Sequence, residues 1–182
     1  MKQKRVFLKK GIVVIPDISG FTDFVMSTKL LLGQFIICKL LHSIVRTNNL
    51  HFEISEIEGD AVLFYKYGNI PTFVEIISQI KLIHENFKTE IERLSIKLMM
   101  DIPLSLKVIV HYGAFSKYRI GRFEKLYGIP IVEAHKMLKY RIPKAPPYAL
   151  LSDEYLAVYF STYSNALQYG VYIPDVGYIH YF

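Results

Sequence analysis

Two short motifs each place an aspartate beside an apolar run in this 182-residue chain. PDISGFT, at 16–22, follows the β-branched run GIVVI, and SEIEGDAVLFY, at 55–65, ends in the apolar run AVLFY. If these runs are neighbouring strands, Asp17 and Asp60 can be aimed at one point, where paired carboxylates would hold Mg²⁺ or Mn²⁺. The alternative is that each aspartate only stabilises a turn, Asp17 before a helix and Asp60 within a Glu-Gly-Asp hairpin.

The elements that would position these residues are predicted from hydrophobic periodicity and from capping and turn residues. Strands are expected at 11–15, 51–55, 61–65, 104–111 (closed by Tyr112-Gly113), 123–127, 148–151, 169–173 and 177–181. Helices are expected at 24–48 (capped by Thr22 or Asp23, with Gly33 as a weak point), 72–99, 131–140 and after Ser152. Too few helices separate the strands of the hairpins for a purely parallel sheet.

This order of elements predicts an α/β (α+β) fold of ferredoxin-like type, with a mixed β-sheet and long helices on one face. We expect a single domain over residues 1–182, because the length fits one core and no linker or repeat interrupts it. Residues 1–10 are expected to be a basic N-terminal extension or part of the first strand.

Composition excludes several classes of protein. Of the residues, 52% are hydrophobic and 21% are charged, which is not the balance of a disordered chain. A single cysteine, Cys38, allows no internal disulfide, and we expect it in the core. No apolar run approaches the roughly 20 residues of a membrane span. The net charge of +6 includes no dense basic stretch beyond Lys2 to Arg5 with Lys9 and Lys10, so we expect no nucleic-acid partner. The N-terminus does not have a signal-peptide pattern and there is no spanning run, so we expect a cytoplasmic protein without a membrane partner.

Four segments resemble the catalytic domain of class III nucleotidyl cyclases: GIVVIPDISGFTDF, SEIEGDAVLFY, LKVIVHYGAF and KLYGIPIVEAHKML. YALLSDEYL fits a late strand and short helix of that family, and the combination is most similar to an uncharacterised bacterial branch. The resemblance implies a cyclase-type fold, a nucleoside triphosphate as substrate, two divalent ions and a homodimer whose sites form between two chains.

The resemblance also implies a role for individual residues. The metal ligands would be Asp17, Asp60 and the Ile18 carbonyl; the phosphate loop would be Ser19, Gly20, Phe21 and Thr22; the purine would be read by Glu56 and the facing Lys125; and Lys136 would stabilise charge in the reaction. His111 and His135 have no metal-ligand spacing, so both are expected to be structural.

Several of these positions depart from the cyclase pattern. Glu56 alone points to guanine, but Lys125 is unusual at its position, and we hypothesise that the two form an ion pair in place of the base. Val132 stands where the family has a transition-state Asn, and Lys136 replaces an Arg, which loses the forked donor geometry. Asp175 begins the segment DVG where active members often carry a phosphate-binding Lys.

Three functions therefore remain open. The first is a cyclase-homology domain with impaired catalysis, which keeps a divalent-metal or nucleotide-phosphate site and acts in signalling or scaffolding. The second is an active cyclase (a phosphorus–oxygen lyase) that converts GTP or ATP to a cyclic nucleotide and pyrophosphate. The third is a structural or interaction module whose acidic residues do no chemistry.

Overall fold

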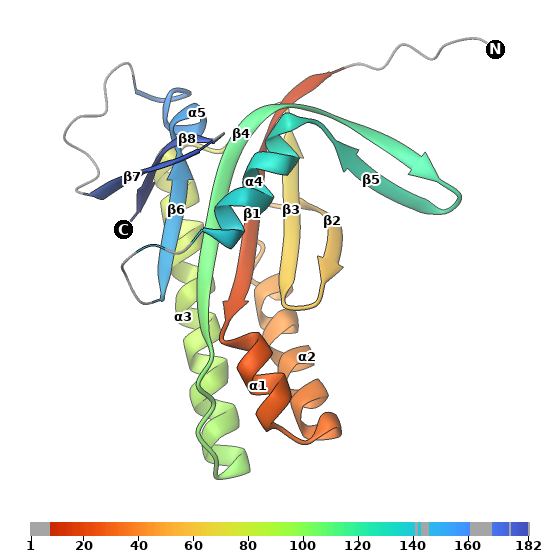
Figure 1. Cartoon of the computed structure of the whole chain (residues 1–182), viewed down its shortest axis with the longest axis vertical. Helices are drawn as coiled ribbons and strands as arrows, with labels where there is room; N and C mark the ends of the chain where they lie inside the picture. Colours follow the sequence, from red (N-terminus) through yellow and green to blue (C-terminus); the bar gives the residue numbers. More distant parts are fainter. Residues whose placement is uncertain (1–7, 141, 143–145, 161–168, 175, 182) are drawn as a thin grey trace.

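An eight-stranded mixed sheet forms the centre of the structure (Figure 1). The computed structural model describes residues 8–140, 142, 146–160, 169–174 and 176–181. The strands are β1 (Lys9–Ser19), β2 (Glu53–Glu58), β3 (Ala61–Tyr67), β4 (Ser105–Ile120), β5 (Phe123–Tyr127), β6 (Tyr148–Ser152), β7 (Tyr169–Ile173) and β8 (Gly177–Tyr181). Their order is β2-β3-β1-β4-β6-β8-β7, and β5 pairs with the far end of β4. The β4–β6 pair is parallel and the other pairs are antiparallel, which confirms the predicted mixed sheet.

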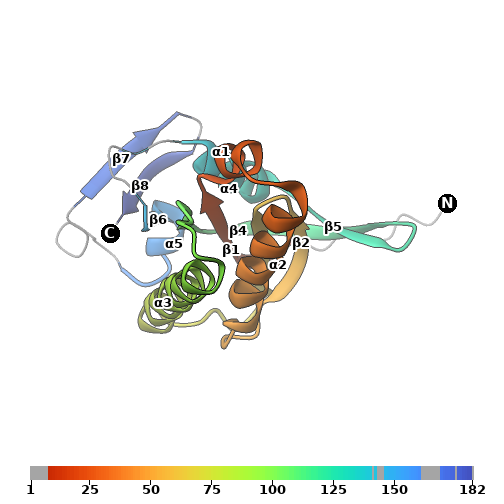
Figure 2. The same ribbon diagram turned by 90° about the horizontal axis from the view of Figure 1, so that it is seen from below.

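The two long helices cover one face of this sheet, as predicted (Figure 2). The helices are α1 (Phe21–Ser27), α2 (Leu30–Arg46), α3 (Phe73–Leu98), α4 (Ile129–Lys139) and α5 (Asp153–Leu156). Buried side chains of α2 and α3, such as Leu40 and Ile80, pack on one face of the sheet, and Ala134 and Met137 of α4 pack on the other. The long helix α3 begins with a capping box, in which the Glu75 amide donates to the Thr72 hydroxyl and the Glu75 carboxylate accepts from the Thr72 amide.

The prediction of one continuous helix over 24–48 is wrong. Thr28 has an extended backbone (φ −111°, ψ 143°) that ends α1 and separates it from α2. Gly33, expected to be the weak point, lies buried within α2 beside the Thr28 side chain. The helical spacing of apolar residues continues on both sides of the break, so periodicity alone could not locate it.

Strand β4 is twice as long as expected, because Gly113 does not end it. A Cβ atom at Gly113 would overlap the ring of Pro130 at the start of α4, so glycine is needed for this crossing rather than for a turn. Beyond the crossing, β4 continues to Ile120 and returns as β5, and the two strands form an arm that extends away from the main sheet (Figure 1).

Other local predictions have mixed outcomes. The hairpin β7–β8 and the cap of α5 are confirmed, since the Ser152 hydroxyl accepts from the Tyr155 amide. Cys38 is exposed on α2 and is not a core residue. No helix in the described part of the chain is long and apolar enough to cross a bilayer. The single domain over 1–182 remains a prediction.

Candidate functional site

A cavity of about 590 Å³ lies at the end of β1, beside the β2–β3 turn. Asp17 is opposite Ala61 of β3, and the Ile18 amide donates to the backbone carbonyl of Asp60 over 3.1 Å. These backbone contacts hold Asp17 and Asp60 next to each other, and both line the cavity with Ile18. The structure thus brings together the three residues that were predicted as metal ligands.

Lys107 adds a positive charge to the same cavity. It lies opposite Asp17 in the β1–β4 register, and its ammonium is 3.1 Å from the Asp17 carboxylate, with both side chains 16% exposed. The ammonium also donates to the Leu138 carbonyl of α4. Sequence reasoning missed Lys107, although a lone lysine inside the apolar run LSLKVIVH was a visible signal.

Acidic side chains outnumber this lysine in the cavity, whose lining includes Asp17, Asp23 and Asp60. Burial raises the pKa of Asp60, and repulsion from the Asp17 carboxylate raises it further, while the Asp60 backbone hydrogen bond and Lys107 act in the opposite direction. The pKa of Tyr148, in the cavity wall, is raised by burial and then by Asp17. A cation placed between the carboxylates would relieve this repulsion.

The predicted phosphate loop borders the cavity but begins later than expected. Ser19 still belongs to β1, and the chain turns only at Gly20, whose φ of 88° favours glycine. A Cβ there would also lie 2.9 Å from the Pro103 carbonyl oxygen. Helix α1 starts directly after Gly20, so the expected cap by Thr22 or Asp23 is wrong. All residues from 18 to 23 line the cavity.

Glu56 and Lys125 form the ion pair that was hypothesised from the sequence. The Lys125 ammonium of β5 donates to the Glu56 carboxylate of β2, and this hydrogen bond raises the pKa of Lys125. The Glu56 and Lys125 side chains are 24% and 42% exposed. Glu56 also lines a smaller cavity of about 290 Å³, which shares Asp17 and Asp60 with the larger one. The carboxylate expected to read the purine therefore already has a cationic partner.

The transition-state positions lie elsewhere on the same chain. Val132 and Lys136 are on α4 and line an apolar cavity of about 570 Å³ with Leu8, Leu126 and Ile129. Neither Asp17 nor Asp60 lines that cavity. Lys136 thus lines a different cavity from the two aspartates. Asp175, the last of the departures from the cyclase pattern, is outside the described residues.

A profile of the family described as "Protein of unknown function (DUF2652)" matches residues 37–146. The chain belongs to the DUF2652 family. A curated relative, the uncharacterized protein Rv2561/Rv2562 of Mycobacterium tuberculosis, is 25% identical over 108 residues, which are 56% of this chain and 50% of that protein. The chain therefore spans about half the length of the curated relative that it matches.

Solved structures extend the comparison from sequence to fold. The guanylyl cyclase Cya2 has a TM-score of 0.74 at 10% identity, covering 96% of this chain and 92% of that one. The adenylyl cyclase CyaB from Pseudomonas aeruginosa has a TM-score of 0.68 at 16% identity over 84% and 81% of the two chains. A class III adenylyl cyclase-like ATP-binding protein from Pseudomonas aeruginosa has a TM-score of 0.69 at 15% identity over 86% of this chain and 37% of that protein. These similarities confirm the cyclase-type fold.

The contacts of His111 in this DUF2652 domain are those of a structural residue. His111 is fully buried, its Nδ1 lies 2.7 Å from the Ser152 hydroxyl, and its Nε2 lies 2.9 Å from the Glu133 carboxylate. This chain of contacts ties β4 to β6 and α4. His135 lines the smaller cavity beside Asp17 and Asp60. Among the described residues, no three His, Cys, Asp or Glu side chains form a metal cluster.

Two carboxylates can nevertheless suit a particular class of metal ion. Mg²⁺ is usually held by one or two carboxylates, several waters and the phosphates of a substrate, rather than by a complete protein cage. Asp17 and Asp60 with the Ile18 backbone match that limited donor set. The pKa of Asp60 is raised first by burial and then by repulsion from Asp17, and a cation between the two carboxylates would offset that repulsion. The donor set of the cavity therefore fits a hard divalent cation with open coordination positions.

Proposed function

We propose that this cyclase-homology domain binds a nucleoside triphosphate with Mg²⁺ or Mn²⁺, has impaired cyclase activity, and acts in signalling or as a scaffold. One observation carries the proposal: Asp17, Asp60, Lys107 and the 18–22 loop line a single cavity. This cavity contains two carboxylates that can hold a cation, and a lysine and a tight backbone turn that can bind phosphate. The similarity to an adenylyl cyclase-like protein described as ATP-binding supports binding as a function in this fold.

Within this proposal, each residue of the cavity has a defined task. Asp17, Asp60 and the Ile18 carbonyl would hold the cation, which when bound withdraws charge from phosphoryl oxygens. Gly20 would let the backbone approach the phosphates closely. Lys107 would turn from Asp17 to a phosphate oxygen, because the cation replaces it as the partner of that carboxylate.

The complete site would need a second copy of the chain. Lys136 and Val132 line a cavity that contains neither aspartate, so a cyclase-like arrangement can combine them only from two chains. A homodimer fits this division. The arm formed by β4 and β5 extends from the sheet, and it would contact the second chain in such a dimer.

Two features account for impaired catalysis. Val132 is apolar and cannot donate a hydrogen bond, and the loss of one electrostatic donor costs about 100-fold or more in rate. The Glu56–Lys125 ion pair also uses the carboxylate that would bind guanine. Binding of the triphosphate is thus favoured over its conversion.

Two other functions have a specific observation in their favour. Glu56 and the paired aspartates support an active cyclase that makes cyclic nucleotide and pyrophosphate from GTP or ATP. The Asp17–Lys107 ion pair supports a purely structural module, since it balances the charge of Asp17 within the chain.

Calorimetry and a turnover assay on the same protein separate the three. The full chain is titrated with GTP and with ATP, each with and without Mn²⁺, and incubated to detect cyclic nucleotide. We expect Mn²⁺-dependent binding that Asp17→Asn abolishes and Asp101→Asn, an exposed aspartate outside the cavity, preserves. Cyclic product that depends on Asp17 would establish the active cyclase instead, and no Mn²⁺-dependent binding would leave the structural module.

A further inference from the structure

The lower end of the helical layer exposes large apolar side chains. The turn between α1 and α2 and the C-terminal end of α3 lie together there (Figure 1). The most exposed are Met26 at 84%, Leu30 at 81%, Leu31 at 78%, Ile96 at 80% and Met99 at 92%. We call these five residues the helical tip. Scattered apolar residues are normal on a protein surface, but five that are this exposed at one end indicate an interaction site.

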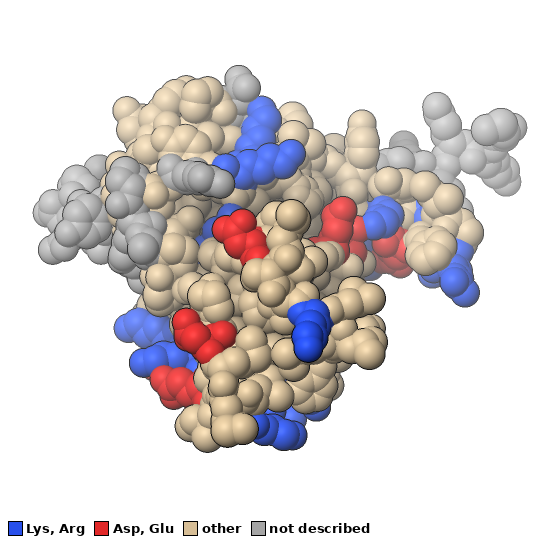
Figure 3. All heavy atoms as spheres, turned by 60° about the horizontal axis from the view of Figure 1, so that its bottom comes forward, with Lys and Arg blue, Asp and Glu red and all other residues tan. Residues whose placement is uncertain are grey.

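Three basic side chains lie near the helical tip. The ammonium groups of Lys39 and Lys97 lie 5.8 and 6.0 Å from the centre of the Phe35 ring, one from α2 and one from α3, and Lys29 is next to Leu30. In the described parts of the chain, none of these three lysines has a carboxylate within 4.0 Å. Figure 3 shows this end as a largely uncharged surface with separate basic groups toward its edges, together with a few acidic ones. Asp23 and Asp101 are the exposed acidic residues nearest in sequence.

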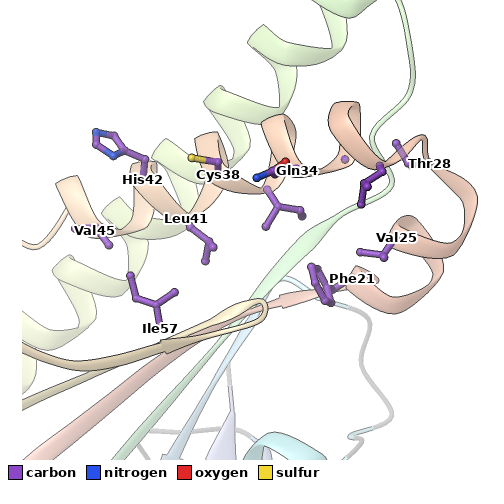
Figure 4. Close-up of a pocket in the computed structure, with 12 residues that line it drawn as sticks. Phe21, Val25, Thr28, Gln34, Cys38, Leu41, His42, Val45 and Ile57 are labelled. Atoms are coloured by element: carbon purple, nitrogen blue, oxygen red, sulfur yellow. The ribbon is translucent and has the colours of Figure 1, made fainter. Parts of the chain in front are cut away.

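An apolar trench continues from the helical tip along α2. It has a volume of about 560 Å³, and Val25, Leu30, Leu41 and Val45 are among its walls. Figure 4 shows Phe21 and Val25 facing the α2 side chains across it, with Ile57 of β2 at the far end. The apolar surface is therefore larger than the tip alone.

We propose that the helical tip docks on an anionic lipid membrane. Side chains that are about 80% exposed project from the molecule, so they can enter a lipid surface without a complementary partner pocket. The lysines beside them would meet anionic headgroups, and the net charge of +6 adds a long-range attraction. The sequence led us to expect no membrane partner because it has neither a spanning segment nor a dense basic stretch. Docking needs no span, and Lys39 and Lys97 come together only in the fold. The inference is independent of the proposed nucleotide site.

Vesicle flotation with the full chain tests this docking. The protein is mixed with vesicles of phosphatidylcholine alone or of phosphatidylcholine with phosphatidylglycerol, at low and at high salt. We expect flotation with the anionic vesicles only, weaker at high salt because the attraction is screened. Leu30→Gln with Leu31→Gln should weaken binding at least about tenfold. Lys39→Gln with Lys97→Gln should weaken it roughly fivefold for each lysine.

The matched control is Ile120→Gln with Phe123→Gln, which removes two exposed apolar residues from the arm and should leave flotation unchanged. Thermal melting checks that all variants are folded. The proposal is overturned if the parent chain does not float with anionic vesicles, or if the leucine variant floats as well as the parent. A leucine variant that only changes a dimer into a monomer, with no vesicle binding by the parent, would assign the tip to a second copy of the chain.

Discussion

Replacing Lys125 by methionine should give this domain a preference for guanine nucleotides. The Lys125 ammonium is the cationic partner of Glu56, whose carboxylate resembles the guanine-reading group of guanylyl-type cyclases. Methionine keeps the length of the side chain and removes its charge. The freed carboxylate would then accept hydrogen bonds from the guanine edge, whereas adenine offers it no matching donors.

The structure sets the scale of both effects. With Glu56 24% and Lys125 42% exposed, the ion pair contributes only about 0.2–1 kcal/mol to stability, so the variant should remain folded. Hydrogen bonds to a charged group contribute about 1.5–3 kcal/mol. After reorganisation of the carboxylate, we expect affinity for GTP to rise about tenfold relative to ATP, which corresponds to about 1.4 kcal/mol.

Calorimetric titration with GTP and ATP in the presence of Mn²⁺ measures this ratio. Arg122→Met is the matched control, because it removes a cation from the arm that contacts Phe123 and not Glu56. A double variant, Lys125→Met with Glu56→Gln, should lose the gain. If Lys125→Met binds Mn²⁺-nucleotide as tightly as the parent chain and the GTP-to-ATP ratio is unchanged, Glu56 does not read the base.

Three further predictions concern the cavity and the sheet. Lys107→Met removes the ion-pair partner of Asp17, so the affinity for Mn²⁺ alone should rise several-fold. The affinity for nucleotide with Mn²⁺ should rise less, because the lysine that would contact phosphate is lost. Equal changes of affinity in the two calorimetric titrations would contradict a phosphate role for Lys107. The raised pKa of Asp60 means that the folded state holds this proton more strongly than the unfolded chain, so stability should fall as pH rises from the ordinary value of 3.8 through the raised pKa. Asp60→Asn should remove that decrease in urea unfolding, and Asp101→Asn should not. Gly113→Ala should lower the free energy of unfolding by about 1–3 kcal/mol, because the new Cβ atom would overlap the Pro130 ring. Gly121→Ala is the comparison: its Cβ atom would meet no other atom, so any loss of stability there comes only from the backbone φ of 57°.

Local signals in the sequence were sufficient where neighbouring residues decide the structure. Helix α3 begins at Phe73, next to its predicted start at residue 72, and its capping box of Thr72 and Glu75 involves only neighbouring residues. The apolar residues on either side of Gly59 form the predicted β2–β3 hairpin, although β2 runs from Glu53 to Glu58 rather than over 51–55. The break at Thr28 and the passage of β4 through Gly113 depend on contacts with distant residues, Pro130 among them, which periodicity cannot show. Lys107 was missed for the same reason, because its partner Asp17 is ninety positions away.

Two ion pairs within the chain involve carboxylates that the cyclase resemblance assigns to ligands. Asp17 and Glu56 are carboxylates that the cyclase resemblance assigns to a cation and to a base, and each has a lysine of the same chain as its partner. A partly buried carboxylate without a counter-charge is costly, so each lysine offsets that cost when no ligand is bound. Each lysine must also be displaced before a ligand can use its carboxylate, which lowers affinity. The Asp17–Lys107 pair is the less exposed of the two, and we therefore expect cation binding to be the step that the chain restrains most.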